Sequence, residues 1–256
     1  MKKNMMKKNM MKKAKVFLLF YLFTFLPLMG CAQQRQTDTF KTPSGKDVKI
    51  TCIKHGTFQI EYDGRYFYVD PVTVLKPQTD FTTMPRANYI LITHEHADHF
   101  DRMALTQLVS STTIVYTNPN VSQLFRNARV MQNGDSVTIG DDLTLKAVPA
   151  YNTTKGHEQF HPKGRDNGYI LSIDGLRIYI AGDTEDIPEM KDIHDIDIAF
   201  LPCNQPYTMT VDQLVKAAKI IKPKVLFPYH YSDTPVSKIK LLLSGTGIDV
   251  RIRSYQ

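Results

Sequence analysis

The chain has 256 residues, and its apolar share of 42% is ordinary for a protein with a packed core, which excludes a disordered chain. Its formal net charge is +7, but residues 1–30 hold seven lysines and no acidic residue. The remaining residues therefore carry 25 basic and 25 acidic side chains, since the totals are 32 and 25. Without a charge surplus in the folded part, binding to nucleic acid is disfavoured.

The first 30 residues have the layout of a secretory signal peptide. Lysines come first, and residues 16–29 then form an apolar run of about 14 residues. This run is shorter than the roughly 20 residues that a permanent transmembrane helix needs. It ends in Leu28-Met29-Gly30-Cys31, which resembles the lipobox of bacterial lipoproteins, where the Cys receives lipid and becomes the new N-terminus. An ordinary signal sequence is the alternative.

These features predict three segments: a lipoprotein signal peptide at residues 1–30, a tether at 31–46 and one domain at 47–256. The stretch from residue 32 to about 43 is polar, rich in Gln and Thr and without periodicity, as is typical of a tether. A lipid on Cys31 would anchor the protein to a membrane of the cell envelope, outside the cytoplasm, on the periplasmic or outer-membrane side. Cys52 and Cys203 remain in the domain, where they either pair or stay free.

Short β-rich runs separated by turn residues dominate the chain after residue 47. Asp63-Gly64 lies between runs 60–62 and 65–69, and Asp174-Gly175 lies between runs 170–173 and 176–180. Each pair predicts a tight hairpin, because Asp-Gly supplies the positive φ angles of a type I′ turn. Further strands are expected at 48–54, 89–93, 113–116, 136–139, 143–148, 196–201, 225–228 and 248–252.

Helices are fewer. The clearest one is expected from Val211 to about Lys222, because Thr210 and Gln213 form a capping-box pattern and Pro223 stops the helix. Weaker helices are expected near 102–109, 121–127 and 236–244. No internal repeat or Gly/Ser linker divides this part of the chain, so a single domain of about 210 residues is expected.

Residues 89–101 (YILITHEHADHFD) form an apolar strand that leads directly into four potential metal ligands. On an extended backbone His94 and His96 project to the same side, where they can share one ion. Asp98 and His99 can serve a second ion beside the first. Imidazoles with a carboxylate suit Zn, Fe or Mn, so the sequence leaves the metal open. A His-rich surface loop is the alternative, and four ligand types directly after a buried-type strand disfavour it.

This segment matches the His-x-His-x-Asp-His signature of the metallo-β-lactamase fold superfamily, and the resemblance extends from Asp47 to Arg253. It implies an α/β protein, a four-layer αββα sandwich with the site at one edge of two sheets. It also implies three later ligands: a third His, an Asp that bridges two ions, and a late His. Asp183, in Ala181-Gly182-Asp183, resembles the bridging Asp, and His230 resembles the late His.

Two residues compete for the third His. His161 opens a His-Pro-Lys-Gly run similar to one in a related subgroup, so His161 is favoured over His157. Asp70 resembles an early Asp-Pro of the family, where it can hydrogen-bond a ligand His and fix its tautomer. His55 matches an early position of the same subgroup, with a structural role as plausible as a functional one. His194 is expected to be solvated.

The resemblance implies two divalent ions, zinc first and Mn or Fe as alternatives, that lower the pKa of a water toward about 7 for hydrolysis. Asp98 would orient this water as well as bind metal. Asn204, Tyr207 and Tyr229 lie beside ligand-bearing strand ends, where they either donate to the substrate or pack as ordinary loop residues.

The branch with a bridging Asp is similar to lactonases and to a phospholipase D. The expected reaction is therefore hydrolysis of an ester, lactone or phosphodiester bond in a small-molecule or lipid-derived substrate. True β-lactamases usually place a Cys or another residue where Asp183 stands, which disfavours antibiotic hydrolysis. The alternatives are a lipid-anchored metal-binding module without catalysis and a metal-dependent nuclease, which would need a basic groove. The substrate and the oligomeric state stay open.

Overall fold

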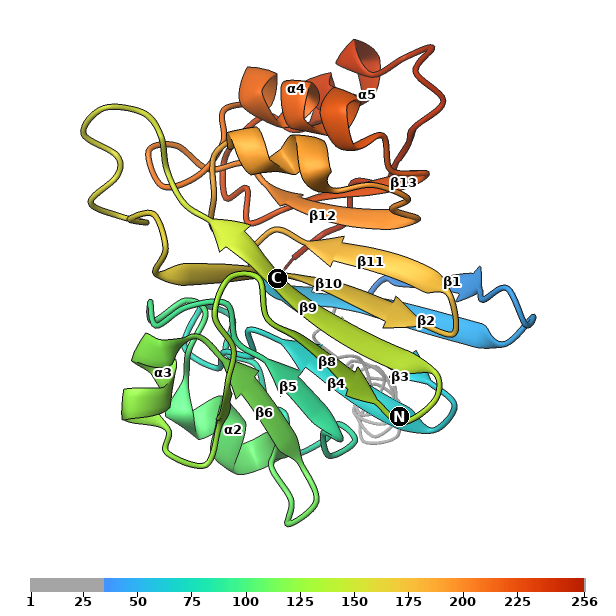
Figure 1. Cartoon of the computed structure of the whole chain (residues 1–256), viewed down its shortest axis with the longest axis vertical. Coiled ribbons are helices and arrows are strands. Elements are labelled where there is room, and N and C mark those ends of the chain that lie inside the picture. Colours follow the sequence, from blue (N-terminus) through green and yellow to red (C-terminus); the bar gives the residue numbers. More distant parts are fainter. Residues whose placement is uncertain (1–34, 256) are drawn as a thin grey trace, which may run out of the picture. The chain divides into compact units, whose positions relative to one another are not determined.

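In the computed structural model, which describes residues 35–255, two seven-stranded sheets carry helices on their outer faces (Figure 1). The first sheet follows chain order and begins with an antiparallel meander, after which the later pairings are parallel. Its strands are β1 (Thr37–Lys41), β2 (Asp47–Lys54), β3 (Thr57–Tyr62), β4 (Arg65–Val69), β5 (Tyr89–Leu91), β6 (Ile114–Thr117) and β7 (Arg129–Val130).

The second sheet repeats this plan in the rest of the described chain. It also changes from antiparallel to parallel pairing, here at β11 and β12. Its strands are β8 (Ser136–Ile139), β9 (Leu143–Ala150), β10 (Asp166–Ile173), β11 (Leu176–Ile180), β12 (Ile198–Pro202), β13 (Val225–Tyr229) and β14 (Asp249–Val250).

Three hydrophobic clusters separate four layers. The middle cluster joins side chains of both sheets, such as Phe58 and Ile60 of β3 with Phe200 of β12, and Phe58 stacks on Phe200 at 3.9 Å between ring centroids. Helices α2 (Arg102–Leu108) and α3 (Pro119–Leu124) cover the outer face of the first sheet. The short helix η1 (Pro188–Asp192), α4 (Val211–Ile221) and α5 (Ser237–Leu242) cover the second. The predicted αββα sandwich is confirmed.

Local sequence signals explain most of these elements. In β2 the inward-facing Val48, Ile50 and Cys52 are buried and alternate with more exposed residues, whereas all five residues of β12 are buried because layers cover both of its faces. Both Asp-Gly hairpins are present, with Asp63 and Asp174 at positive φ. The capping box predicted for α4 is present as well.

The domain begins earlier than predicted. Residues 37–41 form β1, so the prediction of a tether is wrong for this segment. Asp38 is buried and accepts hydrogen bonds from Arg251 at 2.8 Å and from Arg253 at 2.7 Å. Phe40 packs edge-on against Phe227. Because these partners lie more than 180 residues away in the chain, the local composition of the segment does not reveal them.

The signal peptide and the lipidation of Cys31 fall outside the described residues. Within residues 35–255, none of the helices combines the length and the apolar character that a membrane crossing requires. Cys52 and Cys203 are both free and buried, so the two do not pair. Burial raises the pKa of the Cys52 thiol to about 11 and that of Cys203 to about 12.

Candidate metal centre

The predicted ligands meet at one edge of the two sheets. His94 to His99 follow β5, Asp183 follows β11, and His230 follows β13. The carboxyl ends of parallel strands lie at the same edge, so these three segments converge there. His161 arrives from the connection between β9 and the antiparallel β10, which turns at that edge too.

The first group of potential metal ligands, which we call the first metal position, consists of His94, His96 and His161, whose ligand atoms all lie within 4.8 Å of one another. His94 Nε2 is 3.1 Å from His96 Nδ1. His94 and His161 are fully buried, and His96 is partly exposed. The prediction of His161 as the third His agrees with this geometry. His157 instead lies 3.3 Å from Glu185 and outside the cluster.

A second group of potential ligands, which we call the second metal position, includes Asp98, His99 and His230. Asp98 Oδ2 is 3.2 Å from His230 Nε2 and 3.7 Å from His99 Nε2. The rings of His99 and His230 are stacked, with centroids 5.1 Å apart. His55 joins this group, a placement that the sequence left open.

Asp183 lies between the two positions. Its Oδ2 is 3.4 Å from His161 Nε2 of the first position and 3.3 Å from His230 Nε2 of the second. Its Oδ1 is 3.3 Å from His99 Nε2. A carboxylate with neighbours on both sides has the geometry of a ligand shared by two ions.

The donor set fits divalent cations. Zinc–nitrogen and zinc–oxygen bonds of about 2.0–2.1 Å in a tetrahedron place neighbouring ligand atoms about 3.3 Å apart, which matches the spacings around Asp183. His99 Nε2, His161 Nε2 and Asp183 Oδ1 are also buried without a hydrogen-bond partner among the described residues. Such atoms are costly to bury unless a further partner satisfies them, and a cation between them would do so.

Burial and neighbouring charges shift the pKa values of the cluster in different directions. Burial holds the pKa of His94 well below its ordinary value, so this imidazole is neutral, as a metal ligand must be. Burial alone would lower the pKa of His99, but three nearby carboxylates outweigh burial and hold it well above its ordinary value. Burial would raise the pKa of Asp183, yet neighbouring imidazoles, first those of His230 and His99, keep it well below its ordinary value.

Buried hydrogen bonds on the side of the ligand rings away from the metal position fix the orientation of the ligands. His99 Nδ1 donates to Asp70 Oδ2 at 2.7 Å, which directs His99 Nε2 toward Asp183. The Thr93 hydroxyl donates to Asp70 at 2.7 Å and lies 2.9 Å from His94 Nδ1. Asp70 therefore has the tautomer-fixing contact that the sequence predicted.

The first metal position has a similar support that sequence reasoning missed. His161 Nδ1 donates to Asp166 Oδ2 at 2.9 Å, and Arg165 donates to the same carboxylate. The available signal was an Asp five residues after His161, at the start of the strand that leads back into the sheet. His157 also has a buried carboxylate partner, Glu185 at 3.3 Å, which accepts from the Thr153 N–H at 2.8 Å as well, but His157 lies outside the cluster.

Gly182 allows the chain to pass close to its neighbours just before Asp183. Its φ is +66°, and a Cβ at this position would lie 2.8 Å from the Asn167 carbonyl oxygen. Any larger residue would clash with backbone there, so the close approach to β10 requires glycine at position 182.

The other predicted site residues lie around this edge or away from it. Asn204 is half-buried, with its Nδ2 3.4 Å from Ser232 Oγ, and Tyr207 is exposed. Tyr229 is fully buried and packs against Phe58 and Phe200. Its predicted contact with a substrate is therefore wrong: the strand that delivers His230 directs Tyr229 into the core between the sheets.

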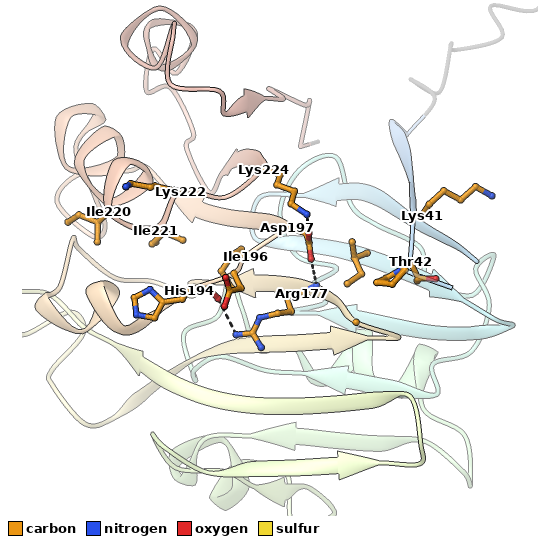
Figure 2. A pocket seen from close by; sticks show the side chains of 14 residues that line it. Lys41, Thr42, Arg177, His194, Ile196, Asp197, Ile220, Ile221, Lys222 and Lys224 are labelled. Atoms are coloured by element: carbon orange, nitrogen blue, oxygen red, sulfur yellow. Dashed lines mark hydrogen bonds and ion pairs between the residues drawn. The ribbon is translucent and has the colours of Figure 1, made fainter. Parts of the chain in front are cut away.

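A separate hollow of about 910 Å³ lies at the opposite ends of β11, β12 and β13 (Figure 2). It contains His194, which is exposed as predicted. Two of its charged side chains have partners: Lys224 pairs with Asp197 at 2.7 Å, and Arg177 donates to the His194 carbonyl oxygen at 3.2 Å. Among the described residues, the groups able to hold a metal ion lie only at the other edge.

The comparisons with known proteins agree with this fold and site. A model of the beta-lactamase superfamily domain matches residues 49–230. A UPF0173 metal-dependent hydrolase of Carboxydothermus hydrogenoformans is 32% identical over 197 residues, which cover 74% of this chain and 87% of the relative. A relative of the same name from Ligilactobacillus salivarius is 33% identical over 75% of this chain and 88% of its own length.

Solved structures are similar as well. The crystal structure of a provisionally named metal-dependent hydrolase from Parabacteroides distasonis has 54% sequence identity and a TM-score of 0.84, and the match covers 87% of this chain and all of that one. Igni18, a metallo hydrolase from Ignicoccus hospitalis, has 25% identity and a TM-score of 0.68 over 81% of this chain and 95% of its own.

The relatives named above are metal-dependent hydrolases and the superfamily model matches most of the chain, so the chain is a metal-dependent hydrolase of the β-lactamase superfamily. The present chain belongs to the UPF0173 metal-dependent hydrolase family within that superfamily.

Proposed function

We propose that this hydrolase cleaves an ester, lactone or phosphodiester bond and that it uses two divalent ions, zinc first and Mn or Fe as alternatives. The observation that supports two ions is the place of Asp183, which has His161 of the first position at 3.4 Å and His230 of the second at 3.3 Å. When bound, two such ions would lower the pKa of a water toward about 7 and polarise the bond to be cleaved.

The residues of the chain supply orientation and charge. Asp98 has a side chain that is 35% exposed, whereas Asp183 is 2% exposed, so Asp98 is the carboxylate of the cluster that a water or substrate can reach. Burial would raise the pKa of Asp98, but the surrounding imidazoles hold it well below its usual value, so it stays ionised. Asp98 therefore orients the attacking water by accepting a hydrogen bond from it. The half-buried Asn204 donates an amide N–H to the substrate.

The test is a turnover panel of one lactone, one carboxylic ester and one phosphodiester, bis-p-nitrophenyl phosphate, with metal content measured on the same preparation. We expect two ions per chain and turnover in at least one class. Asp183→Asn should bind fewer ions and lose most of that turnover, because the shared carboxylate is gone. His194→Ala, altered at the opposite ends of the strands, should match the wild type. Two bound ions without turnover of any class would favour a metal-binding module instead.

We also propose that a lipid on Cys31 anchors the protein in the cell envelope, outside the cytoplasm, and that its substrate is a small or lipid-derived molecule and not nucleic acid. The position of Gln36 supports a short connection. Cys52 N donates to the Gln36 carbonyl oxygen at 3.0 Å, so the chain enters the first sheet beside the end of β2, three residues before His55. An anchor would thus be attached near the edge that carries the metal centre.

A further inference from the structure

His55 lies at the second metal position although the family signature does not include it. It follows β2 in the turn to β3, and its side chain is 16% exposed. Its Nε2 is 3.2 Å from Asp98 Oδ2, the same distance as that of His230 Nε2 from this oxygen. The rings of His55 and His230 have centroids 3.7 Å apart.

The backbone around His55 holds the ring in this place. His55 has a φ of +48°, a left-handed conformation that is unfavourable for a non-glycine residue and persists only where the surroundings impose it. The His230 N–H donates to the His55 carbonyl oxygen at 3.2 Å. At Gly56 a Cβ would lie 3.0 Å from His99 Cε1, so this turn is pressed against the metal centre.

We propose that His55 is a further protein ligand of the second metal position. The ligand atoms of His55, Asp98, His99 and His230 all lie within 4.8 Å of one another. Two imidazole nitrogens at equal distance from one carboxylate oxygen have the spacing of neighbouring ligands on a single ion. A His that only supported Asp98 would need its nitrogen to face that carboxylate, but it would not need to lie within reach of His99 and His230 as well.

This assignment makes the two metal positions unequal, and it rests on the two-ion part of the proposed function. The first position has three imidazoles and the shared Asp183, a four-ligand set that suits tetrahedral zinc. The second then has His55, Asp98, His99, His230 and the shared Asp183. Five protein ligands exceed what tetrahedral zinc takes and suit an ion of higher coordination number, such as Fe, Mn or Co.

The test compares the wild type with His55→Asn. Asn tolerates the left-handed backbone, so this variant keeps the turn while it removes the imidazole. The metal-free proteins are titrated with Co²⁺ and followed by calorimetry and by the visible absorption of the bound ion, which depends on coordination number. We expect the affinity for the second ion to be about 10–100-fold lower in the variant, or lower still. Loss of a residue that only supports a ligand already lowers metal affinity by about 10–100-fold. We also expect the absorption of this ion to change in intensity.

His157→Asn is the matched control, because it removes a nearby imidazole that lies outside the cluster, and it should titrate like the wild type. Thermal unfolding of the metal-free proteins shows whether the variants are folded. Wild-type affinity and spectrum for both ions in folded His55→Asn would overturn the proposal. A wild type that binds fewer than two ions would instead overturn the two-ion mechanism, so the two failures are distinguishable.

Discussion

Asp70 connects two ligands of the metal centre from below. It is fully buried, its Oδ2 accepts from His99 Nδ1 and from the Thr93 hydroxyl, and its Oδ1 accepts from the Thr93 N–H. An uncharged amide in its place would offer an N–H toward at least one of these donors. The orientation of His99 would then be lost although the ligand itself remains.

We therefore expect Asp70→Asn to weaken the ion at the second metal position by about 10–100-fold while the first position keeps most of its affinity. Asp166→Asn is the mirror experiment, because Asp166 supports His161 and should affect the first position. Stepwise metal titration of both variants, with circular dichroism as a check of folding, measures these affinities. Equal weakening of both positions by both variants would show that the two carboxylates act on folding rather than on separate ligands.

At the scale of single elements, β1 depends on contacts that join the two ends of the domain. Burial alone would raise the pKa of Asp38, but hydrogen bonds from Arg253 and Arg251 outweigh burial and lower that pKa below 3.8. A lowered pKa in the folded state means that the carboxylate stabilises the fold above the pKa of the unfolded chain. This contribution is lost as the pH falls through the lower, folded-state pKa.

Asp38→Asn should therefore reduce the free energy of unfolding by about 1–2 kcal/mol at neutral pH, since the two arginines stay partly exposed. The difference from the wild type should stay constant from about pH 5 to 8 and shrink below about pH 4. Urea unfolding at several pH values measures it. Asp47→Asn is the control on the same hairpin, because its pair with Lys41 is solvent-exposed, and its effect should stay within about 0.5 kcal/mol. A pH-independent difference for Asp38→Asn would contradict the role of its charge.

The same elements show what the sequence could and could not predict. Strands with apolar alternation, such as β2, and helix α4 with its capping box were predictable because their signals are local. β1 was missed since its inward residues include the charged Asp38, whose arginine partners are distant in the chain. β7, with two exposed residues, offers no apolar signal at all.

The residues of the candidate site were likewise predictable only where their signals are local in the sequence. The ligands after β5 form one short motif, and Asp183 and His230 each follow an apolar strand, so the strand ends could be matched to the family. The role of His55 could not be read from its neighbours, because it depends on how the turn after β2 is pressed against His99 and His230. Tyr229 was misplaced because the side on which a strand residue points is set by the register of the whole sheet.

At the scale of the whole molecule, the proposed anchor site lies shortly before β1 in the chain, and β1 pairs with the strand that leads into the metal centre. β1 begins at Thr37, which pairs with Thr51 of β2, and β2 leads into His55. Five residues separate Cys31 from Thr37, and six steps of an extended chain span at most about 20 Å. A lipid on Cys31 would thus keep the first sheet, and the edge that carries the second metal position, close to the membrane surface. Such an arrangement would suit the lipid-derived substrate proposed above.

We expect the full chain expressed in a bacterial host to incorporate a clickable palmitate analogue and to sediment with membranes even in high salt. Salt should not release it, because residues after the leader carry no net charge that could bind anionic lipid. Cys31→Ser should lose the label and move to the soluble fraction, while Cys203→Ser, which alters a buried thiol, should keep both properties. Because the proposed lipid on Cys31 carries both the label and the membrane attachment, the label and the sedimentation should be lost together. Membrane association of Cys31→Ser equal to that of the wild type would contradict the proposed lipid anchor and leave the metal centre unaffected.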